Sequence, residues 1–320
     1  MKAVLLSLLS ITDHHFQKLS QYYEVLIVDS AAQALALPQD TLNKVEAVYS
    51  SATTQMPLEL LDVLPNLKVI SSNGVGFDPY DENYIRSRQI RLGYTPEVLN
   101  DCVADLAFAL LLDCARQVSA SDRYVRAGRW LSDGPYQLTT QVTGKRLGIL
   151  GLGRIGMEIA ERAKGFKMEI LYHNRNPRSD VPYRYINSVL ELAKQCDFLM
   201  VATPGGPENA KLINQEVLEA LGAEGFLINI ARGVVVDEDA LVLALQNKLI
   251  AGAALDVFVN EPHVPEALFE LDNVTVVPHI ASATVETRGA MRDLSITNLL
   301  HFAQHGEVKV SVPWADYSIS

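Results

Sequence analysis

The fold of this 320-residue chain is decided by the stretch Lys145-Arg146-Leu147-Gly148-Ile149-Leu150-Gly151-Leu152-Gly153-Arg154-Ile155-Gly156. Its first half is a short apolar run, typical of a buried strand, and it leads directly into the spacing G-x-G-x-x-G. After the glycines, Ile155, Ile159 and Ala163 recur every four residues, as in a helix that packs on one side. The stretch therefore predicts a strand, a tight glycine turn and a helix.

Each glycine of this motif has its own physical reason. Gly151 permits the tight turn, Gly153 lets a pyrophosphate approach the backbone, and Gly156 lets the helix pack closely on the strand. The helix N-terminus then offers N–H groups and partial positive charge to the phosphates. A glycine-rich turn without a ligand is the alternative, but the strand–turn–helix context favours a dinucleotide site.

The second strand of this unit, predicted over residues 168–174, ends without an acidic residue. A site for NAD places an Asp or Glu about 20 residues after the glycines, where it binds the ribose hydroxyls. Here Asn174 offers hydrogen bonds, and Arg175 and Arg178 offer positive charge that suits a 2′-phosphate. We therefore expect NADPH as cofactor, with NADH bound more weakly. The alternative is that both arginines are solvated loop residues.

Short apolar runs alternate with helical stretches along the whole chain, which predicts an α/β fold with parallel sheets wrapped in helices. The predicted strands are Ala3–Leu9, Val25–Asp29, Ala47–Ser50 and Lys68–Ser72, followed by Arg146–Gly151, Met168–Asn174, Asp197–Thr203, Phe226–Ile230, Gly252–Val257 and Val274–Pro278.

A long helix is predicted between these two sets, from about Val98 to Arg126. It carries two apolar stripes, and a helix that is apolar on two faces needs two partners. One partner is its own domain; of a neighbouring domain and a second subunit, we favour the subunit as the other. The stripes are Val103, Leu106, Leu110, Cys114 and Val118, and Ala104, Phe108, Leu112 and Ala115.

Composition excludes several classes of protein. Apolar residues make up 48% of the chain and charged residues 20%, which is ordinary for a globular protein. The net charge of -11, without a Lys/Arg-rich run, argues against nucleic acid or an anionic membrane as partner. The three cysteines lack zinc-ligand spacing and predict a reducing compartment. We interpret Met1–Ser10 as a first strand rather than a signal peptide, and expect a cytoplasmic protein.

Four landmarks, taken in order, carry a resemblance to a known family. They are Gly151–Gly156, Ile228-Asn229-Ile230-Ala231-Arg232-Gly233, Ala254-Leu255-Asp256-Val257-Phe258-Val259-Asn260-Glu261-Pro262, and Pro278-His279-Ile280-Ala281-Ser282-Ala283-Thr284-Val285-Glu286-Thr287-Arg288. Together they resemble the D-isomer-specific 2-hydroxyacid dehydrogenases over essentially the whole chain. Residues 122–130 and 137–146 are most similar to the glyoxylate/hydroxypyruvate reductases, with hydroxyphenylpyruvate reductases as close relatives.

The resemblance implies two flavodoxin- or Rossmann-like domains with the active site in the cleft between them. Residues 1–98 together with 287–320 would form the substrate (catalytic) domain, and residues 99–286 would form the dinucleotide-binding domain. It also implies a homodimer joined through the cofactor domains, which agrees with a helix that is apolar on two faces.

Three catalytic residues follow from the resemblance, and their chemistry fits a 2-oxo acid. The guanidinium of Arg232 can bind a carboxylate and the adjacent keto oxygen through parallel hydrogen bonds. His279 would supply the proton that the reduced oxygen needs, because imidazole titrates near neutral pH. Glu261 would orient that imidazole and stabilise its protonated form. Taken singly, each of these residues is more often structural; the three motifs together favour the catalytic interpretation.

The resemblance also implies further contacts. Backbone N–H groups of Val75 and Gly76 would hold the substrate carboxylate, as suits a glycine-bearing loop. Asp256 would accept a hydrogen bond from the nicotinamide carboxamide. The remaining implied cofactor contacts are Arg154 and Ile155 at the pyrophosphate, Thr203 and Pro204 beside the nicotinamide, and Ile230, Ala231 and Ala281. Gly205-Gly206 replaces the Leu-Thr of many relatives and lacks their side-chain hydroxyl, so the contact to the ribose is expected to differ. Ala281 replaces the glycine of many relatives, and its methyl group is expected to shift the nicotinamide or narrow the pocket slightly without abolishing catalysis.

The leading hypothesis is NADPH-dependent reduction of glyoxylate and hydroxypyruvate to glycolate and D-glycerate. A reductase of bulkier 2-oxo acids such as hydroxyphenylpyruvate is the alternative within the same chemistry. An NAD(P)-sensing scaffold similar to the corepressors of this family is an alternative of another class.

Overall fold

The computed structural model describes residues 2–54 and 56–313. The chain divides into two compact units, which are described separately. Unit 1 combines the chain up to Val98 with the chain from Thr284 onward, and unit 2 runs from Leu99 to Ala283. Unit 1 resumes at Thr284, whose side chain caps the following helix by accepting from the N–H of Thr287.

Unit 1 is built around a parallel sheet with the strand order β2-β1-β3-β4-β5. This is the flavodoxin-like order, and the α/β expectation is confirmed. Its strands are β1 (Ala3–Ser7), β2 (Tyr23–Ile27), β3 (Val45–Ser51), β4 (Val69–Asn73) and β5 (Arg91–Gly93). Its helices are α1 (Asp13–Leu19), α2 (Ala31–Leu35), α3 (Gln39–Leu42), α4 (Leu58–Asp62), α5 (Glu82–Ser87) and α13 (Val285–His305).

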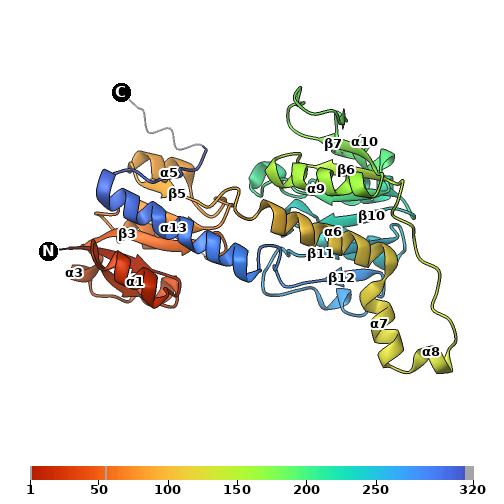
Figure 1. The fold of residues 1–320 in the computed structure, drawn as a ribbon, viewed down its shortest axis with the longest axis horizontal. Coiled ribbons are helices and arrows are strands. Elements are labelled where there is room, and N and C mark those ends of the chain that lie inside the picture. Colours follow the sequence, from red (N-terminus) through yellow and green to blue (C-terminus); the bar gives the residue numbers. More distant parts are fainter. Residues whose placement is uncertain (1, 55, 314–320) are drawn as a thin grey trace. The chain divides into compact units, whose positions relative to one another are not determined.

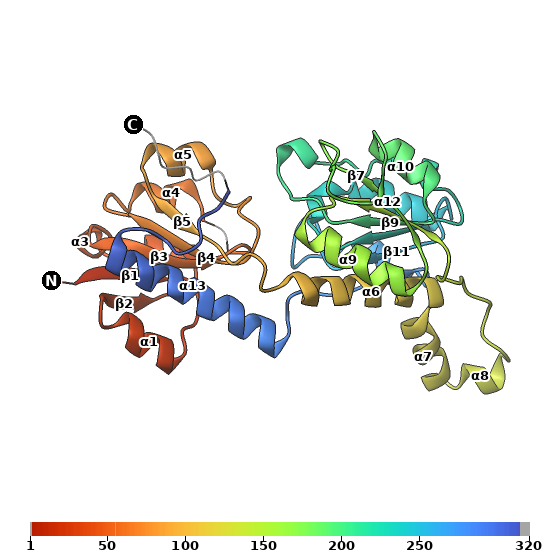
Figure 2. The same cartoon turned by 45° about the horizontal axis from the view of Figure 1, so that its top comes forward.

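The two faces of this sheet are covered by different parts of the chain. Helices α3, α4 and α5 pack on one face of the sheet, where Leu42, Leu60 and Ile85 are part of the hydrophobic core. On the other face, Leu19 of α1 packs with Ile296 and Leu299 of α13, and α13 lies along the strands (Figure 2). The last helix therefore covers one face of a sheet whose strands all come from the N-terminal part of the chain.

Unit 2 is built around a second parallel sheet with the order β12-β11-β10-β9-β6-β7-β8. Its strands are β6 (Arg146–Leu150), β7 (Glu169–His173), β8 (Arg184–Tyr185), β9 (Phe198–Val201), β10 (Phe226–Asn229), β11 (Gly252–Leu255) and β12 (Val274–Val276). Its helices are α6 (Asn100–Arg116), α7 (Val118–Arg126), α8 (Arg129–Ser132), α9 (Arg154–Gly165), α10 (Val189–Gln195), α11 (Gln215–Leu221) and α12 (Glu238–Gln246), and short 3₁₀ turns lie at η1 (Pro207–Asn209), η2 (Gly233–Val235) and η3 (Glu266–Leu268).

The strand order of unit 2 reverses between β6 and β9. The chain proceeds from β6 to β7 and β8 on one side, and from β9 to β12 on the other. In open parallel sheets, ligands bind beyond the carboxyl ends of the strands at such a switch point. The glycine motif follows β6, so the topology places it at the position where a dinucleotide is expected.

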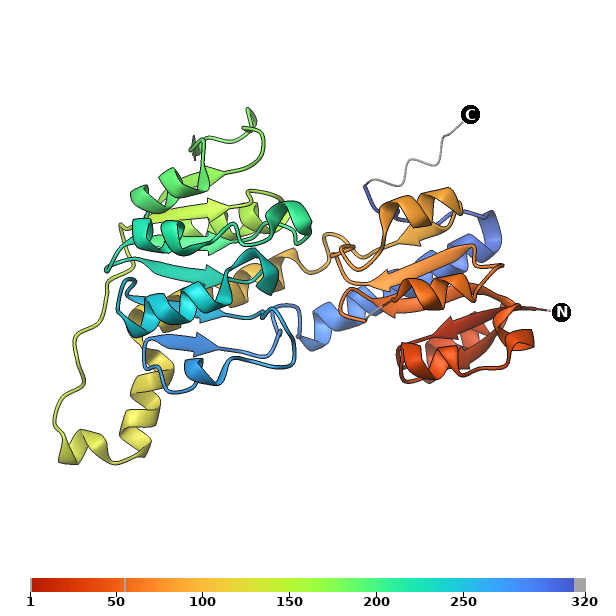
Figure 3. The ribbon, with the colours of Figure 1, turned by 180° about the vertical axis from the view of Figure 1, so that it is seen from behind.

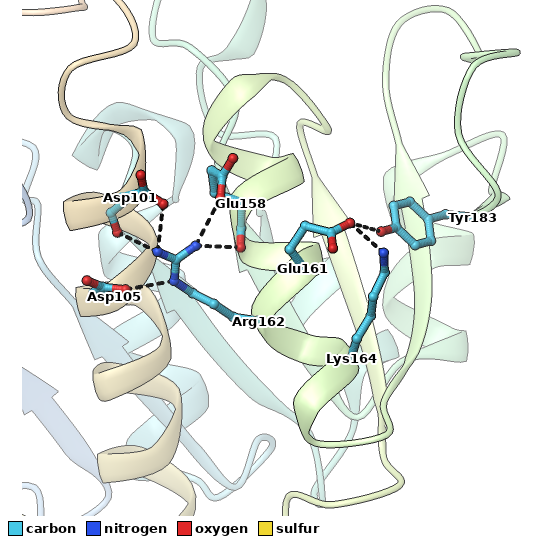
Figure 4. A network of polar contacts seen from close by, with 7 residues as sticks. All are labelled: Asp101, Asp105, Glu158, Glu161, Arg162, Lys164 and Tyr183. Carbon is cyan, nitrogen blue, oxygen red and sulfur yellow. Dashed lines mark hydrogen bonds and ion pairs between the residues drawn. The ribbon is translucent and has the colours of Figure 1, made fainter.

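Helices cover both faces of this sheet, with α6 and α9 on one face (Figure 1) and α10, α11 and α12 on the other (Figure 3). One guanidinium joins the first pair (Figure 4): Arg162 of α9 donates from Nε to Asp105 of α6 at 2.7 Å, from Nη2 to Asp101 at 3.0 Å and from Nη1 to Glu158 at 3.2 Å. The ring of Phe108 also stacks on that of Phe166.

The prediction of one helix from 98 to 126 is wrong. The helix ends at Gln117, whose φ of 51° is left-handed, and α7 begins at Val118. The new helix is stabilised because Asp113 accepts from the N–H of Ser119 at 2.6 Å. Both faces of α6 are covered within unit 2, by α9 and by β10 to β12, so the second stripe does not require a second subunit.

A group of strongly exposed apolar side chains lies farther along, on α8 and the loop after it. Trp130 is 65% exposed, Leu131 95% and Leu138 99%. Val125, Gly128, Trp130 and Leu131 line an open hollow of about 450 Å³. This segment extends away from the body of unit 2 (Figures 1 and 3).

Two absences hold for residues 2–54 and 56–313. No helix there is long and apolar enough to cross a membrane. No three His, Cys, Asp or Glu side chains there are grouped so that they could hold a metal ion.

Candidate active site

The unit 2 residues predicted to act on cofactor or substrate all follow the carboxyl ends of its strands. The glycine motif follows β6, Asn174 follows β7 and Thr203 follows β9. Arg232 and His279 lie beyond β10 and β12, and Glu261 lies in the loop after β11. Parallel strands bring these ends to one edge of the sheet.

The glycine loop has the geometry that a pyrophosphate requires. Gly151 has a φ of +100°, and a Cβ on it would lie 2.6 Å from the backbone N of Thr203. A Cβ on Gly156 would lie 2.3 Å from the carbonyl oxygen of Gly151, whereas Gly153 has open space where a Cβ would be. Gly153 is also the N-cap of α9 and has no side chain to occupy the N–H groups of the first turn. These residues fit a bound dinucleotide.

The loop after β7 is tied to the glycine loop. Asn174 Oδ1 accepts from the N–H of Leu152 at 2.6 Å, and Arg178 Nη1 donates to the Leu152 carbonyl at 2.9 Å. The hydroxyl of Tyr172 accepts from the N–H of Arg178 at 2.8 Å. Asn174 and Arg178 therefore hold the glycine loop, which is predicted to bind the phosphates.

The two arginines of this loop differ. The side chain of Arg178 is 30% exposed, pairs with Asp180 at 2.5 Å, and has its pKa raised by that hydrogen bond. The side chain of Arg175 is 77% exposed and lies 3.8 Å from Glu208. Both arginines were predicted to contact a 2′-phosphate, but the contacts of Arg178 with Leu152 and Asp180 give its side chain a structural role that Arg175 does not have.

The histidine and the glutamate of the predicted triad are in contact. His279 Nδ1 lies 2.7 Å from Glu261 Oε2, and the two side chains are 28% and 32% exposed. An ionised carboxylate only accepts hydrogen bonds, so Nδ1 carries the proton of this bond. Nε2 has no hydrogen-bond partner in the described part of the chain and is the nitrogen able to exchange a proton with a substrate.

His279 has an uncommon backbone conformation. Its φ of 51° lies in the left-handed region, which costs a residue other than glycine about 1–3 kcal/mol. The fully buried Asp256 holds this turn: its Oδ1 accepts from the N–H of Ile280 at 2.6 Å and its Oδ2 from Ala281 at 3.1 Å. Burial raises the pKa of Asp256, and the two N–H groups and His279 oppose that shift. Asp256 thus positions the histidine, a role that the sequence did not suggest.

Arg232 lies between β10 and η2 in an extended conformation. The buried Asn229 shapes this turn, accepting from the N–H of Ala231 at 3.1 Å and donating to the carbonyl of Arg232 at 3.0 Å. A Cβ on Gly233 would lie 1.9 Å from the carbonyl carbon of Phe258. The Arg232 segment therefore packs backbone against backbone on the loop that carries Glu261.

The other predicted contacts are found as follows. Ile230, Ala231 and Ala281 are buried, Thr203 is half-buried beside Gly151, and Pro204 is exposed and accepts from Asn209 at 3.0 Å. Val75 and Gly76 follow β4 in unit 1, next to Gly74, whose carbonyl accepts from the N–H of Thr95 at 2.9 Å. The contacts proposed for these residues stay predictions.

The arrangement in unit 2 combines a dinucleotide loop, a guanidinium and a carboxylate-bound imidazole on one sheet edge. Comparison with known proteins agrees with this chemistry. Residues 108–281 match the family model described as the NAD-binding domain of D-isomer-specific 2-hydroxyacid dehydrogenases. The chain belongs to this family. It is an NAD(P)-dependent oxidoreductase, as the sequence resemblance predicted.

The relatives of this 2-hydroxyacid dehydrogenase are reductases of 2-oxo acids. A glyoxylate/hydroxypyruvate reductase of Arabidopsis thaliana is 44% identical over 287 residues, which is 89% of this chain and 91% of that protein. A hydroxyphenylpyruvate reductase of Plectranthus scutellarioides is 47% identical over 260 residues, 81% of this chain and 83% of that protein.

A solved structure shows the same fold. The NADPH-dependent glyoxylate/hydroxypyruvate reductase of Sinorhizobium meliloti, in complex with NADP and malonate, is 39% identical with a TM-score of 0.92 over 98% of each chain. The α/β fold with parallel sheets that the sequence predicted is confirmed.

Proposed function

We propose that this dehydrogenase reduces glyoxylate and hydroxypyruvate to glycolate and D-glycerate with NADPH. The observation that carries the proposal is the 2.7 Å contact between His279 and Glu261, which leaves Nε2 as the proton donor. The similarity to reductases of these two acids supports it.

In this proposal the cofactor supplies a hydride to the keto carbon when it is bound. Arg232 binds the carboxylate and the keto oxygen, so that it stabilises the negative charge that develops on that oxygen. His279 gives its Nε2 proton to the oxygen, and Glu261 stabilises the imidazolium before transfer and keeps the ring oriented afterwards. Solvent returns the proton to His279. We also propose that Val75 and Gly76 bind the substrate carboxylate through their N–H groups.

The preference for NADPH is proposed from the end of β7. No acidic side chain follows directly there, and the exposed Arg175 offers a guanidinium to a 2′-phosphate. Arg178 contributes chiefly by holding Leu152. NADH is expected to bind more weakly, because it lacks the group that Arg175 would contact.

A reductase of bulkier 2-oxo acids is the second candidate. It is favoured by the 47% identity to a hydroxyphenylpyruvate reductase. A 2-ketogluconate reductase of Gluconobacter oxydans is also 44% identical over 258 residues. Glyoxylate, hydroxypyruvate, hydroxyphenylpyruvate and 2-ketogluconate all carry a carboxylate beside a carbonyl group, so the same triad can serve each.

Initial rates on a panel distinguish these candidates. Glyoxylate, hydroxypyruvate, hydroxyphenylpyruvate and 2-ketogluconate are each assayed with NADPH and with NADH. We expect the highest kcat/KM for the two small acids with NADPH. A higher kcat/KM for either larger acid would move the function to the second candidate. Cofactor binding without turnover of any acid would contradict the enzymatic proposal and favour a scaffold.

We further propose that the protein is a homodimer joined through unit 2. The exposed apolar residues Trp130, Leu131 and Leu138 support this, because a second copy would cover them. Light scattering after size-exclusion chromatography should give twice the 35.2 kDa mass of the chain. Trp130→Glu should shift the protein toward monomer; a wild-type monomer would contradict the proposal.

A further inference from the structure

Glu238, the first residue of α12, hydrogen-bonds outside its own helix. Its Oε1 accepts from the backbone N–H of Val259 at 2.8 Å. The helix does not need Glu238 as a cap, because Asp237 is the N-cap and its side chain accepts from the N–H of Ala240. The carboxylate of Glu238 is therefore directed at the loop that follows β11.

That loop carries Glu261. The preceding N–H, of Phe258, donates to Glu261 Oε1 at 3.0 Å, while Oε2 of the same carboxylate binds His279. Two consecutive backbone N–H groups are thus held by two carboxylates, Glu261 and Glu238. The first bond shapes the loop from within, and the second fastens it to α12.

Helix α12 is also close to Arg232 along the chain, because only η2 and two further residues separate them. At Gly233, the added Cβ would also lie 2.3 Å from the backbone N of Val259, which is the atom that Glu238 binds. At Gly233, the segment that contains Arg232 and the loop that contains Glu261 are too close for a side chain to fit between them. At the same point, Glu238 accepts a hydrogen bond from the N–H of Val259 in that loop.

The pKa of Glu238 reflects the proximity of its carboxylate to that of Glu261. Partial burial raises the pKa of Glu238, and the charges of Asp239 and Glu261 raise it further, while the Val259 N–H opposes the shift. The Glu238 carboxylate keeps its hydrogen bond to the N–H of Val259 although the charge of Glu261 lies nearby.

We infer that Glu238 is a positioning residue for the acid–base chemistry of His279: it fastens the Phe258–Glu261 loop to the Arg232 segment, so that Glu261 meets the imidazole at the right angle. The inference rests on the proposed function. It makes Glu238 act through Glu261, without contact to substrate or cofactor.

Three variants test this inference. Glu238→Ala removes the acceptor, and we expect kcat for the best acid of the panel to fall about tenfold to hundredfold, because small misplacements of a catalytic group have effects of this size. Glu238→Gln keeps an oxygen that can accept from Val259, and should restore kcat to within about threefold of wild type. Asp239→Ala removes the same charge from the exposed neighbouring position and should leave kcat unchanged.

Two further readouts separate positioning from loss of structure. The Kd of NADPH, measured by fluorescence, should stay within about twofold of wild type in all three variants, because the glycine loop lies elsewhere. The alkaline limb of the pH profile of kcat/KM should move to lower pH in Glu238→Ala alone, since a poorly held Glu261 stabilises the imidazolium less. A loss of folded protein would lower the amplitude of this profile without moving it.

The inference is overturned if Glu238→Ala keeps the wild-type kcat and pH profile, if NADPH binding falls in parallel with kcat, or if Glu238→Gln is as impaired as Glu238→Ala. NMR of the Nδ1 proton of His279 needs no substrate. A proton signal lost in Glu238→Ala and retained in Glu238→Gln would support the inference even if the wild type turned over no acid, which would contradict only the proposed function.

Discussion

The two ends of the carboxyl edge of unit 2 are built in opposite ways. Beyond β6 and β7, two groups are available to a ligand. They are the backbone of Gly153, which no side chain covers, and the long side chain of Arg175, which is 77% exposed. Beyond β11 and β12, His279 is held by Glu261, and the turn of His279 is held by Asp256. Recognition of a large ligand tolerates an exposed arginine, whereas proton transfer requires fixed atoms.

The comparison predicts its largest effect at His279. In His279→Gln the proposed proton donor is lost, and kcat for reduction should fall by about 10² to 10⁴-fold. The Kd of NADPH should hardly change, because the residues proposed to bind the cofactor lie at the other end of the edge. Steady-state kinetics and fluorescence titration check both quantities. His305→Gln, on α13 of unit 1, is the control and should retain full activity.

An equal loss of NADPH binding and kcat in His279→Gln would contradict the division between the two ends. It would mean that the histidine also holds the cofactor in place.

A smaller effect is expected at the two arginines, and it should differ between them. Arg175→Ala should weaken NADPH binding by about tenfold to hundredfold and leave NADH binding unchanged, since a charge-assisted hydrogen bond to phosphate is worth about 1.5–3 kcal/mol. Arg178→Ala removes the donor to Leu152 and should weaken both cofactors alike, by about tenfold or less. Titration of each variant with NADPH and NADH measures the four Kd ratios.

A loss confined to NADPH in Arg178→Ala would show that this side chain leaves Asp180 and binds the phosphate. The sequence prediction, in which both arginines are phosphate ligands, would then be correct.

The smallest effect is expected at the opposite edge of the same sheet, where a charge pair is purely structural. Asp197 accepts from the N–H of Arg146 at 2.8 Å and from its Nη2 at 2.8 Å, which joins the start of β6 to the start of β9. Partial burial alone would raise the pKa of Asp197, but the hydrogen bonds from Arg146 outweigh it and lower the pKa. Asp197→Asn should cost about 0.5–1 kcal/mol of unfolding free energy at pH 7, and leave kcat unchanged.

The sign of the pH dependence follows from the lowered pKa. A carboxylate with a lower pKa in the folded protein stabilises the fold above the unfolded-state value of about 4, and this stability is lost as the pH falls through the folded value. Urea unfolding at pH 7, 4 and 3 should therefore show a difference between Asp197→Asn and wild type that is nearly constant down to about pH 4 and shrinks toward pH 3. Glu216→Gln, on the exposed face of α11, should show no difference at any pH; a difference of constant size in Asp197→Asn would contradict the assignment.

The sequence predicted the parts of this architecture that depend on patterns along the chain. The apolar runs gave ten of the strands, and the glycine spacing located the phosphate loop. The edge strands β5 and β8 were missed, because Arg91–Gly93 and Arg184–Tyr185 are too short to form a pattern. The break at Gln117 was also missed, because no glycine or proline marks it; the left-handed residue is Gln117, and Asp113 accepts from the N–H of Ser119 in the next helix.

The candidate site also contains residues that sequence motifs identify and contacts that no motif shows. Arg232, Glu261 and His279 lie in sequence motifs, so their identities could be proposed, and the structure shows two of them in contact. The contacts of Glu238 with Val259 and of Arg178 with Leu152 join residues that are 21 and 26 positions apart. No local pattern signals such contacts; they appear only once the strands are aligned.

The two crossings of the chain between its units also order its synthesis. All strands of the unit 1 sheet leave the ribosome first, but the helix that covers one of its faces, α13, is translated only after the whole of unit 2. Unit 2 is continuous and can fold while the chain is still growing. Until α13 is translated, the face of the first sheet that contains Tyr49 and Val69 lacks the cover of Ile296 and Leu299. The nascent chain thus completes its second unit before its first, and a chaperone that binds apolar surface would find that waiting face.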